Sequence, residues 1–349
     1  DDHKSGDFTP YLMRSDDYGR TWRMITDGLP ERAVVWRIVQ DHENPDLLFV
    51  GTEFGVYFTL DGGENWVEMS AGMPPIAARD LLIHEREDDL VVGTFGRSIY
   101  VLDDISPLRA VSEAMLESET QLFPVRRAWW YQERNELGFG QFGYQGNSYF
   151  YAPNPDFGAM ITYYMAEALQ TSEEVRQDAE QAANDAYEDT PFPGFDVIEA
   201  ERRAAPPRVW LVIRDEADTV VRRLSGPTGQ GFHRVNWDLT YPSASAVTAP
   251  DTPESETSGF LVAPGTYTVE LVRQHNGETT VIGERQSIEV ERLTEGALPG
   301  STDDEVVAFW ERIADLQRDV SAASATIEQT SVRLAVLQSA LYRSRTAPG

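Results

Sequence analysis

A short motif written twice constrains the fold of this chain more than any other feature of its sequence. Residues 15–22 (Ser-Asp-Asp-Tyr-Gly-Arg-Thr-Trp) and residues 59–66 (Thr-Leu-Asp-Gly-Gly-Glu-Asn-Trp) both fit the pattern [Ser/Thr]-x-Asp-x-Gly-x-x-Trp, and their tryptophans are 44 residues apart. A second pair of similar segments, 51–61 and 93–103, is related by a shift of 42 residues. A repeat of roughly 40–45 residues built from short strands is typical of the blades of a β-propeller.

The residue types of this motif, the Asp box, suit a tight turn. The glycine tolerates positive φ, and the aspartate can accept hydrogen bonds from the backbone N–H groups of its own turn. The serine or threonine hydroxyl can do the same, and the tryptophan that follows can pack between neighbouring sheets. We therefore assign a structural role to Ser15, Asp17, Gly19, Trp22, Thr59, Asp61, Gly63 and Trp66, and to Asp103 in a degenerate third copy in which Ile-Ser-Pro replaces the glycine and tryptophan.

The strand pattern around the boxes predicts an incomplete propeller. Two short strands flank the first box, four strands lie between residues 34 and 69, and three more lie between residues 80 and 102. Propellers close with about four to eight blades. We expect residues 1–106 to form the C-terminal blades, with the remaining blades supplied by a missing N-terminal part or by a partner chain.

Two segments add a family resemblance to this pattern. Residues 51–57 (Gly-Thr-Glu-Phe-Gly-Val-Tyr) and 94–109 (Thr-Phe-Gly-Arg-Ser-Ile-Tyr-Val-Leu-Asp-Asp-Ile-Ser-Pro-Leu-Arg), together with the boxes, resemble the Asp-box (BNR) repeat proteins. These are the sialidase-like and sortilin-like propellers, often labelled glycosyl hydrolase, BNR repeat-containing. The resemblance is strong over residues 11–108 and weaker to about residue 345. It implies a propeller, but the family includes sialidases, other glycosidases and protein receptors, so it leaves the activity open.

The chain leaves the repeat after residue 106. We predict a linker over 107–158, with a short helix over 107–118, a strand over 122–131 that seals the last blade, and an aromatic, Gly-rich loop at 138–151. A β domain over 159–293 follows. Seven candidate strands in antiparallel order, the last two at 279–282 and 287–290, favour an Ig-like β-sandwich. It is interrupted by a helical insertion at 171–188, which starts with a capping box at Thr171 and Glu174, and by a polar loop insertion at 243–258. Segments 231–238 and 264–267 resemble the Ig-type domain of flagellar hook-capping proteins, which follows the propeller in BNR relatives.

The last segment, residues 302–345, contains neither Gly nor Pro and predicts one long helix that starts with a capping box at Thr302 and Glu305. Its apolar residues are spaced alternately three and four apart through five heptads, as in a coiled-coil seam. Two interpretations remain open: a helix of an intramolecular bundle, which relatives with BNR repeats favour, and an oligomeric coiled coil. The predicted fold class is thus mainly β: a partial Asp-box propeller, an Ig-like sandwich and a long C-terminal α-helix.

The composition excludes several functions. There are 58 acidic and 29 basic residues, a formal net charge of −29, and Lys4 is the only lysine. Such a surface argues against nucleic acid or anionic membrane as partners and fits a salt-adapted, halophilic source, although an arginine-rich codon bias also explains the missing lysines. Without cysteine there is no disulfide or thiolate site. No apolar run is long enough to span a membrane. We expect an extracellular or periplasmic protein whose signal peptide is not in this chain.

The sequence contains no recognisable catalytic motif. It lacks His-Glu-x-x-His, Gly-x-Ser-x-Gly and Gly-x-x-x-x-Gly-Lys, and its five histidines are scattered without the spacing of metal ligands. We therefore predict no metal and no cofactor, and leave catalytic residues unassigned.

In sialidase-like propellers the ligand lies on the disc face opposite the boxes, which the resemblance places at the loops around residues 26–32, 52–55, 70–79 and 94–97 in this chain. The candidate ligand-binding residues on these loops are Glu53, Phe54, Phe95, Arg97, Arg32 and Arg79. Glycosidases use a carboxylate pair, and arginines clamp carboxylate ligands, but a salt bridge between blades is the commoner explanation for a Glu53–Arg97 pair.

Three functions follow as expectations. The first is binding of a protein or glycan ligand on the loop face. The second is a sialidase-like glycoside hydrolase with most catalytic residues in blades absent from this chain. The third is a structural role with oligomerisation through 302–345.

Overall fold

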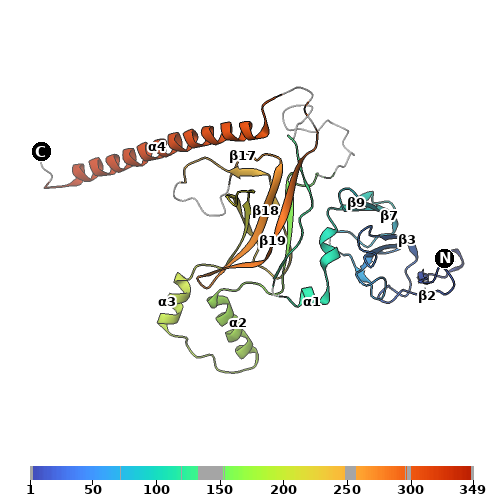
Figure 1. Cartoon of the computed structure of the whole chain (residues 1–349). Coiled ribbons are helices and arrows are strands. Elements are labelled where there is room, and N and C mark those ends of the chain that lie inside the picture. The colour runs from blue at the N-terminus through green and yellow to red at the C-terminus, as the bar shows by residue number, and fades with distance from the viewer. Residues whose placement is uncertain are drawn as a thin grey trace. The chain divides into compact units, whose positions relative to one another are not determined.

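The computed structural model describes residues 3–346 except 71, 119, 133–151, 153, 248–256, 295 and 297–299. The protein is mainly β with a long C-terminal helix (Figure 1), and it divides into two compact units. Unit 1 comprises residues 1–126, 162–167 and 230–232; unit 2 comprises the remaining residues. The predicted aromatic loop at 138–151 lies outside the described residues.

The described residues of unit 1 up to Leu102 form three antiparallel sheets in chain order, after a short 3-10 helix, η1 (His3–Ser5). The sheets are β1 (Met13–Arg14) with β2 (Arg23–Met24); β3 (Val35–Gln40), β4 (Leu48–Thr52), β5 (Gly55–Thr59) and β6 (Val67–Glu68); and β7 (Ala78–His84), β8 (Asp89–Thr94) and β9 (Ile99–Leu102). Each strand pairs with its neighbour in the chain, as the alternating patterns predict.

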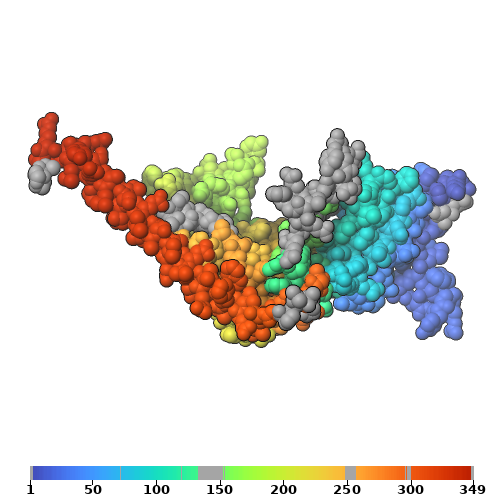
Figure 2. All heavy atoms as spheres, turned by 90° about the horizontal axis from the view of Figure 1, so that it is seen from above, coloured from blue at the N-terminus to red at the C-terminus, as the bar shows by residue number. Residues whose placement is uncertain are grey.

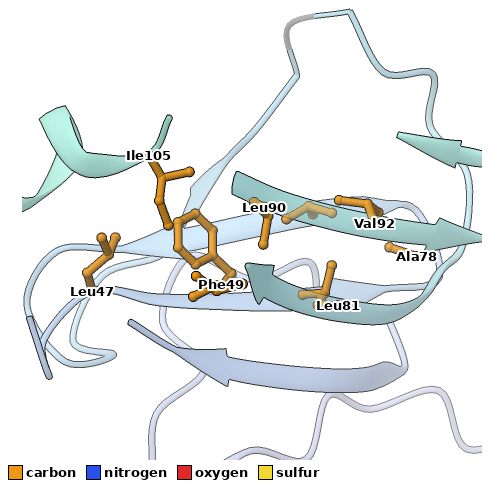
Figure 3. Close-up of a cluster of buried hydrophobic side chains, with 9 residues drawn as sticks. Leu47, Phe49, Ala78, Leu81, Leu90, Val92 and Ile105 are labelled. Carbon is orange, nitrogen blue, oxygen red and sulfur yellow. The ribbon is translucent and has the colours of Figure 1, made fainter. Parts of the chain in front are cut away.

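The four-stranded sheet has a hydrophobic core on each of its faces. Successive side chains of a strand point to opposite faces, so Phe49 packs in one cluster and Leu48 and Val50 pack in the other. Figure 3 shows the first cluster, in which Phe49 meets Leu81 and Leu90 of the third sheet. The second cluster joins the first sheet to the second and is made by Leu12, Ile25, Leu48, Val50, Tyr57 and Trp66. The three sheets are therefore stacked face to face.

An arginine beyond the third sheet connects two hairpin turns. Arg109 lies in the 3-10 helix η2 (Ser106–Ala110) and donates to Asp41 at 2.9 Å through both Nε and Nη2. Nη1 also lies 3.2 Å from Asp88 Oδ2 and 3.0 Å from Glu43 Oε2. Burial acts to raise the pKa of Asp41, but hydrogen bonds from Arg109 and nearby backbone N–H groups lower it below the ordinary value.

The segment that follows is more broken than the sequence predicts. The expected helix over 107–118 is η2 and α1 (Glu113–Leu116), and the expected strand over 122–131 is β10 (Thr120–Leu122) and β11 (Ala128–Trp130). Ser112 interrupts the helix because it accepts a hydrogen bond from Met115 N as the N-cap of α1. Pro124 lacks the N–H group that would continue the strand. β10 pairs with β12 and β11 with β19, so the prediction that this strand seals the third sheet is wrong.

Unit 2 is built on a five-stranded sheet of order β11-β19-β18-β13-β14, with a separate pair β16-β17. Its strands not yet given are β13 (Arg208–Arg214), β14 (Val220–Gly226), β16 (Thr240–Pro242), β17 (Ser258–Leu261), β18 (Gly265–His275) and β19 (Glu278–Arg292). The other two described strands, β12 (Ala159–Met165) and β15 (Gly231–Trp237), belong to a further sheet of order β10-β12-β15. The predicted strands at 279–282 and 287–290 are one 15-residue strand, β19. β11 joins β19 in parallel, a pairing absent from the predicted antiparallel order. The core of the five-stranded sheet includes the buried side chains of Leu211, Val269, Leu271 and Ile288.

The described residues of unit 2 form three helices. α2 (Ser172–Asp185) begins with the predicted capping box, in which Thr171 and Glu174 exchange hydrogen bonds. α3 (Phe195–Arg203) was not predicted, and Glu201 joins it to Arg176 of α2 at 2.9 Å. α4 (Asp303–Arg343) is the predicted long helix, and it also begins with a capping box. None of the 41 residues of α4 is buried, and Figure 2 shows its atoms in red along the face in view.

Candidate ligand-binding site

The two Asp boxes form closed turns through the hydrogen bonds of their aspartates. In the first box, Asp17 Oδ1 accepts from Thr21 N at 2.8 Å and Ser15 Oγ accepts from Gly19 N at 2.7 Å. In the second, Asp61 Oδ1 accepts from Glu64 N at 2.9 Å and Asn65 N at 3.0 Å. The motif therefore recurs because its polar side chains close its own turn.

The third, degenerate turn uses a different aspartate from the one we assigned. Asp104, not Asp103, accepts the turn hydrogen bonds, from the backbone N–H and the hydroxyl of Ser106. Asp104 is buried and has a φ of 54°. Asp104 therefore adopts the positive φ that a glycine adopts in the two complete boxes.

Two equivalent β-bulges place a pair of side chains on the loop surface of unit 1. The register between β3 and β4 shifts between Val35 and Arg37, and the register between β7 and β8 shifts between Ala78 and Asp80. The extra residue is Trp36 in the first case and Arg79 in the second. β-Bulges re-aim a side chain and are enriched next to functional sites.

The residues that follow β4 and β8, Glu53 and Phe95, also occupy equivalent positions in the two repeats. Glu53 N donates to the Val34 carbonyl at 3.0 Å, and Phe95 N donates to the Ala77 carbonyl at 2.9 Å. These backbone bonds hold each turn residue against the strand that carries the bulge. Each of the two repeats therefore presents one bulge residue and one turn residue.

The four side chains, Trp36, Glu53, Arg79 and Phe95, form one group, which we call the loop-surface cluster. The Arg79 guanidinium lies 3.6 Å from the centroid of the Trp36 ring and 5.3 Å from that of Phe95. The Trp36 indole N–H donates to Glu53 Oε2 at 3.0 Å. The edge of His3 meets the Trp36 ring with centroids 5.2 Å apart.

The cluster combines aromatic surface with separated charges. Phe95 is 69% exposed, and Arg79 is also exposed. Among the contacts of the described residues, Arg79 makes cation–π contacts but no ion pair, and the Glu53 side chain bonds to an indole rather than to a cation. A guanidinium held flat on an aromatic ring keeps its N–H edge free for a planar anion.

The other candidate residues lie apart from this cluster. Arg32 stacks over Phe8 with 5.2 Å between the guanidinium carbon and the ring centroid. Phe54 and Arg97 are exposed, and no contact among the described residues joins them to the cluster. The Glu53–Arg97 salt bridge considered from the sequence is likewise absent among those residues. The structure brings together Glu53, Arg79 and Phe95, and it adds Trp36, which the sequence analysis did not single out.

Among the described residues, no group of three or more His, Cys, Asp or Glu side chains is placed to hold a metal ion. No described helix is long and apolar enough to cross a membrane.

Comparisons with known proteins do not assign a family. No protein-family model matches the chain, and no curated protein matches it. Among solved structures, it is similar to the extracellular domain of a one component system from B. thetaiotaomicron, with 10% identity, a TM-score of 0.22, and coverage of 80% of this chain and 28% of that one. For a structure described as the extracellular domain of a hybrid two component system from the same organism, the identity is 10% and the TM-score 0.22, with coverage of 81% of this chain and 29% of that one. The chain thus spans less than a third of these proteins, and scores this low do not establish a shared fold.

Proposed function

We propose that unit 1 binds a glycan that carries a carboxylate, through the loop-surface cluster. The observation that carries the proposal is the Arg79 guanidinium, stacked on Trp36 and unpaired with any carboxylate of the described chain. Arginine recognises carboxylates by two parallel hydrogen bonds. The exposed Phe95 ring offers a flat apolar face on which a sugar ring can stack, and Glu53 can accept a hydrogen bond from a sugar hydroxyl.

The proposal includes the finer fold assignments. The three stacked sheets of unit 1 are taken as blades of an Asp-box propeller that further blades complete, and unit 2 as an Ig-like domain. Their support is the 42–44-residue repeat and the face-to-face stacking of successive sheets. In this arrangement the loop-surface cluster lies on the face away from the Asp-box turns. We further propose that the protein acts outside the cytoplasm, where such glycans occur.

Hydrolysis is the weaker alternative. A retaining or inverting glycosidase needs two carboxyl groups about 5–10 Å apart across the scissile bond. The cluster supplies one, Glu53, and its partner is the Trp36 indole. We therefore propose binding rather than catalysis.

The test is calorimetric titration of the protein with sialyllactose and oligogalacturonate, and with lactose and maltohexaose as neutral references. We expect the acidic sugars to bind and the neutral sugars to bind at least tenfold more weakly. Arg79→Met keeps the apolar stem over Trp36 but removes the charged hydrogen bonds, which are worth about 1.5–3 kcal/mol. The affinity for the acidic sugars should fall about tenfold or more.

The matched control is Arg86→Met, which removes an exposed arginine that pairs with its neighbour Glu87 at 2.7 Å. Its affinity should equal that of the wild type. Equal loss in both variants would indicate a general charge effect. Absence of binding to any acidic sugar, with a folded protein, would refute the proposal.

A further inference from the structure

Helix α4 exposes a continuous apolar seam. Its residues are Val306, Phe309, Ile313, Leu316, Val320, Ala323, Ile327, Thr330, Leu334, Leu337 and Leu341. Leu316 is 61% exposed, Ile327 67% and Leu337 60%. A soluble helix is stabilised chiefly by packing of its apolar face, and a 41-residue helix is about 60 Å long. The seam is therefore a surface that requires a partner.

A groove in unit 2 adjoins the first half of this seam. It has a volume of about 710 Å³, and its lining includes Trp130, Phe260, Leu261, Val306, Trp310 and Ile313. The rings of Phe260 and Trp310 are stacked with centroids 6.4 Å apart. At one end Arg292 pairs with Asp303 and covers the Trp130 ring at 4.3 Å. The groove is thus an apolar slot whose charged end is already neutralised.

The charges of α4 are divided along its length. Residues 303–319 carry six acidic and two basic side chains, a net charge of 2 − 6 = −4. Residues 320–343 carry one acidic and two basic side chains, a net charge of 2 − 1 = +1. Two copies of such a helix are complementary when they run antiparallel, and like halves meet when they run parallel.

We propose that α4 of a second copy of this chain covers the seam, in antiparallel orientation. In the register centred between residues 321 and 322, Val306 of one copy meets Leu337 of the other, and Phe309 meets Leu334. The small Ala323 and Thr330 meet Val320 and Ile313. A parallel, in-register pair would instead place Ala323 on itself and Thr330 on itself, in two layers separated only by the Ile327 layer, which leaves cavities.

The same arrangement provides an occupant for the groove. Because the contact is two-fold symmetric, each copy contributes the same surface. The C-terminal half of each α4 lies over the N-terminal half of the other, and it brings Leu334, Leu337 and Leu341 to the slot beside Trp310. Leu341 is 57% exposed in the single chain.

The orientation is tested by disulfide trapping, which is clean because the chain has no cysteine. Full-length Val306→Cys and Leu337→Cys proteins are mixed in a glutathione redox buffer. The proposal predicts mainly the heterodisulfide between the two variants. A mixture dominated by homodisulfides would show a parallel pair and overturn the proposal, as would no disulfide at all. Glu328→Cys, on the outer face of the helix, is the control that should not cross-link.

The association itself is tested by sedimentation equilibrium of the full chain. We expect a dimer that Leu337→Asp dissociates, whereas Ser339→Asp, which adds the same charge away from the seam, leaves it intact. A wild-type monomer at all concentrations would overturn the proposal.

A variant with higher dimer affinity tests the proposal independently, in case the Leu337→Asp protein does not fold. Arg312 and Arg333 each lie directly before a seam residue, and in the proposed register Arg312 of one copy lies beside Arg333 of the other, two residues from direct opposition, twice per dimer. Arg333→Glu converts both repulsions into ion pairs and should lower the dimer dissociation constant about tenfold. An unchanged constant contradicts this register.

Discussion

The two Asp boxes share a motif and a turn, but they differ in what their tryptophans contact. Trp66 is 5% exposed, and its indole donates to the Ile25 carbonyl of the first sheet at 2.8 Å. Trp22 is 62% exposed, and its indole donates to Gly19 of its own turn at 3.1 Å. The turn is therefore a local structure that closes on its own, whereas the tryptophan gains its packing only from a preceding sheet. The same residue is a core residue in one copy and a surface residue in the other.

The largest expected difference in stability is between alanine variants of the two tryptophans. Trp66→Ala should lower the free energy of unfolding by about 3–5 kcal/mol, because it empties the core between the first and second sheets. Trp22→Ala should lower it by less than about 0.5 kcal/mol. Urea unfolding of both variants, followed by far-UV circular dichroism, measures the two values. Equal losses would contradict the comparison.

Alanine variants of the two box glycines should differ less in stability. Both have positive φ, 82° at Gly19 and 97° at Gly63. A Cβ at Gly63 would also lie 2.8 Å from Ile25 Cδ1, whereas at Gly19 the nearest atom is 3.6 Å away. We expect Gly63→Ala to cost about 2–3 kcal/mol and Gly19→Ala about 1–2 kcal/mol, the latter from backbone strain alone. Thermal unfolding of the pair gives the difference, and a larger loss at Gly19 would refute this account.

The lowered pKa values of the two Asp-box aspartates predict that the free energy of unfolding depends on pH. Burial acts to raise the pKa of Asp61, but hydrogen bonds from Thr59, Asn65 and Glu64 lower it from 3.8 to about 2. Because the folded pKa is depressed, the stabilisation is present above about pH 4 and is lost as the pH falls to about 2. Discounted for solvent exposure, it amounts to about 1 kcal/mol. The pKa of Asp17 is lowered in the same direction, chiefly by the Thr21 backbone N–H.

The measurement is the difference in unfolding free energy between the wild type and Asp61→Asn from pH 2 to pH 7. The difference should be constant above pH 4 and shrink below it, since other carboxylates titrate equally in both proteins. Asp17→Asn serves as the comparison. A difference that does not change with pH would contradict the assignment.

The smallest effect tests how the first sheet supports the second turn. Arg14 Nη1 donates to the Gly62 carbonyl at 2.9 Å. Arg14→Met should cost about 0.5–1 kcal/mol through this hydrogen bond. Arg23→Met is the control, because its Nε lies 3.7 Å from exposed Asp16, and it should leave stability unchanged. A greater loss at Arg23 would contradict the link between the sheets.

Local patterns predicted the local structure of unit 1. The 42–44-residue period places the strands of its three sheets within about two residues of those observed, because alternation and turn residues specify meanders. The capping boxes at Thr171 and Thr302 also located two helix starts. The parallel pairing of β11 with β19 was missed because it joins segments about 160 residues apart, Ala128 with Val290, and no local signal specifies it.

The candidate site was predicted in part. Loop position led to Glu53, Arg79 and Phe95, but a tryptophan within a strand reads as one more core residue. The bulge that turns Trp36 outward is visible only in the strand register. A signal was nevertheless present, since Trp36 and Arg79 are 43 residues apart and occupy the same place in the repeat.

Arg109 has a consequence for the order of folding. It follows Asp41 by 68 residues and Asp88 by 21 residues. In a chain synthesised from its N-terminus, both acidic turns leave the ribosome before the guanidinium that neutralises them. The second and third sheets can therefore form their hairpins early, but they carry uncompensated like charges at adjoining turns until residue 109 emerges. The ion pairs that connect the two turns can therefore form only after residue 109 has left the ribosome.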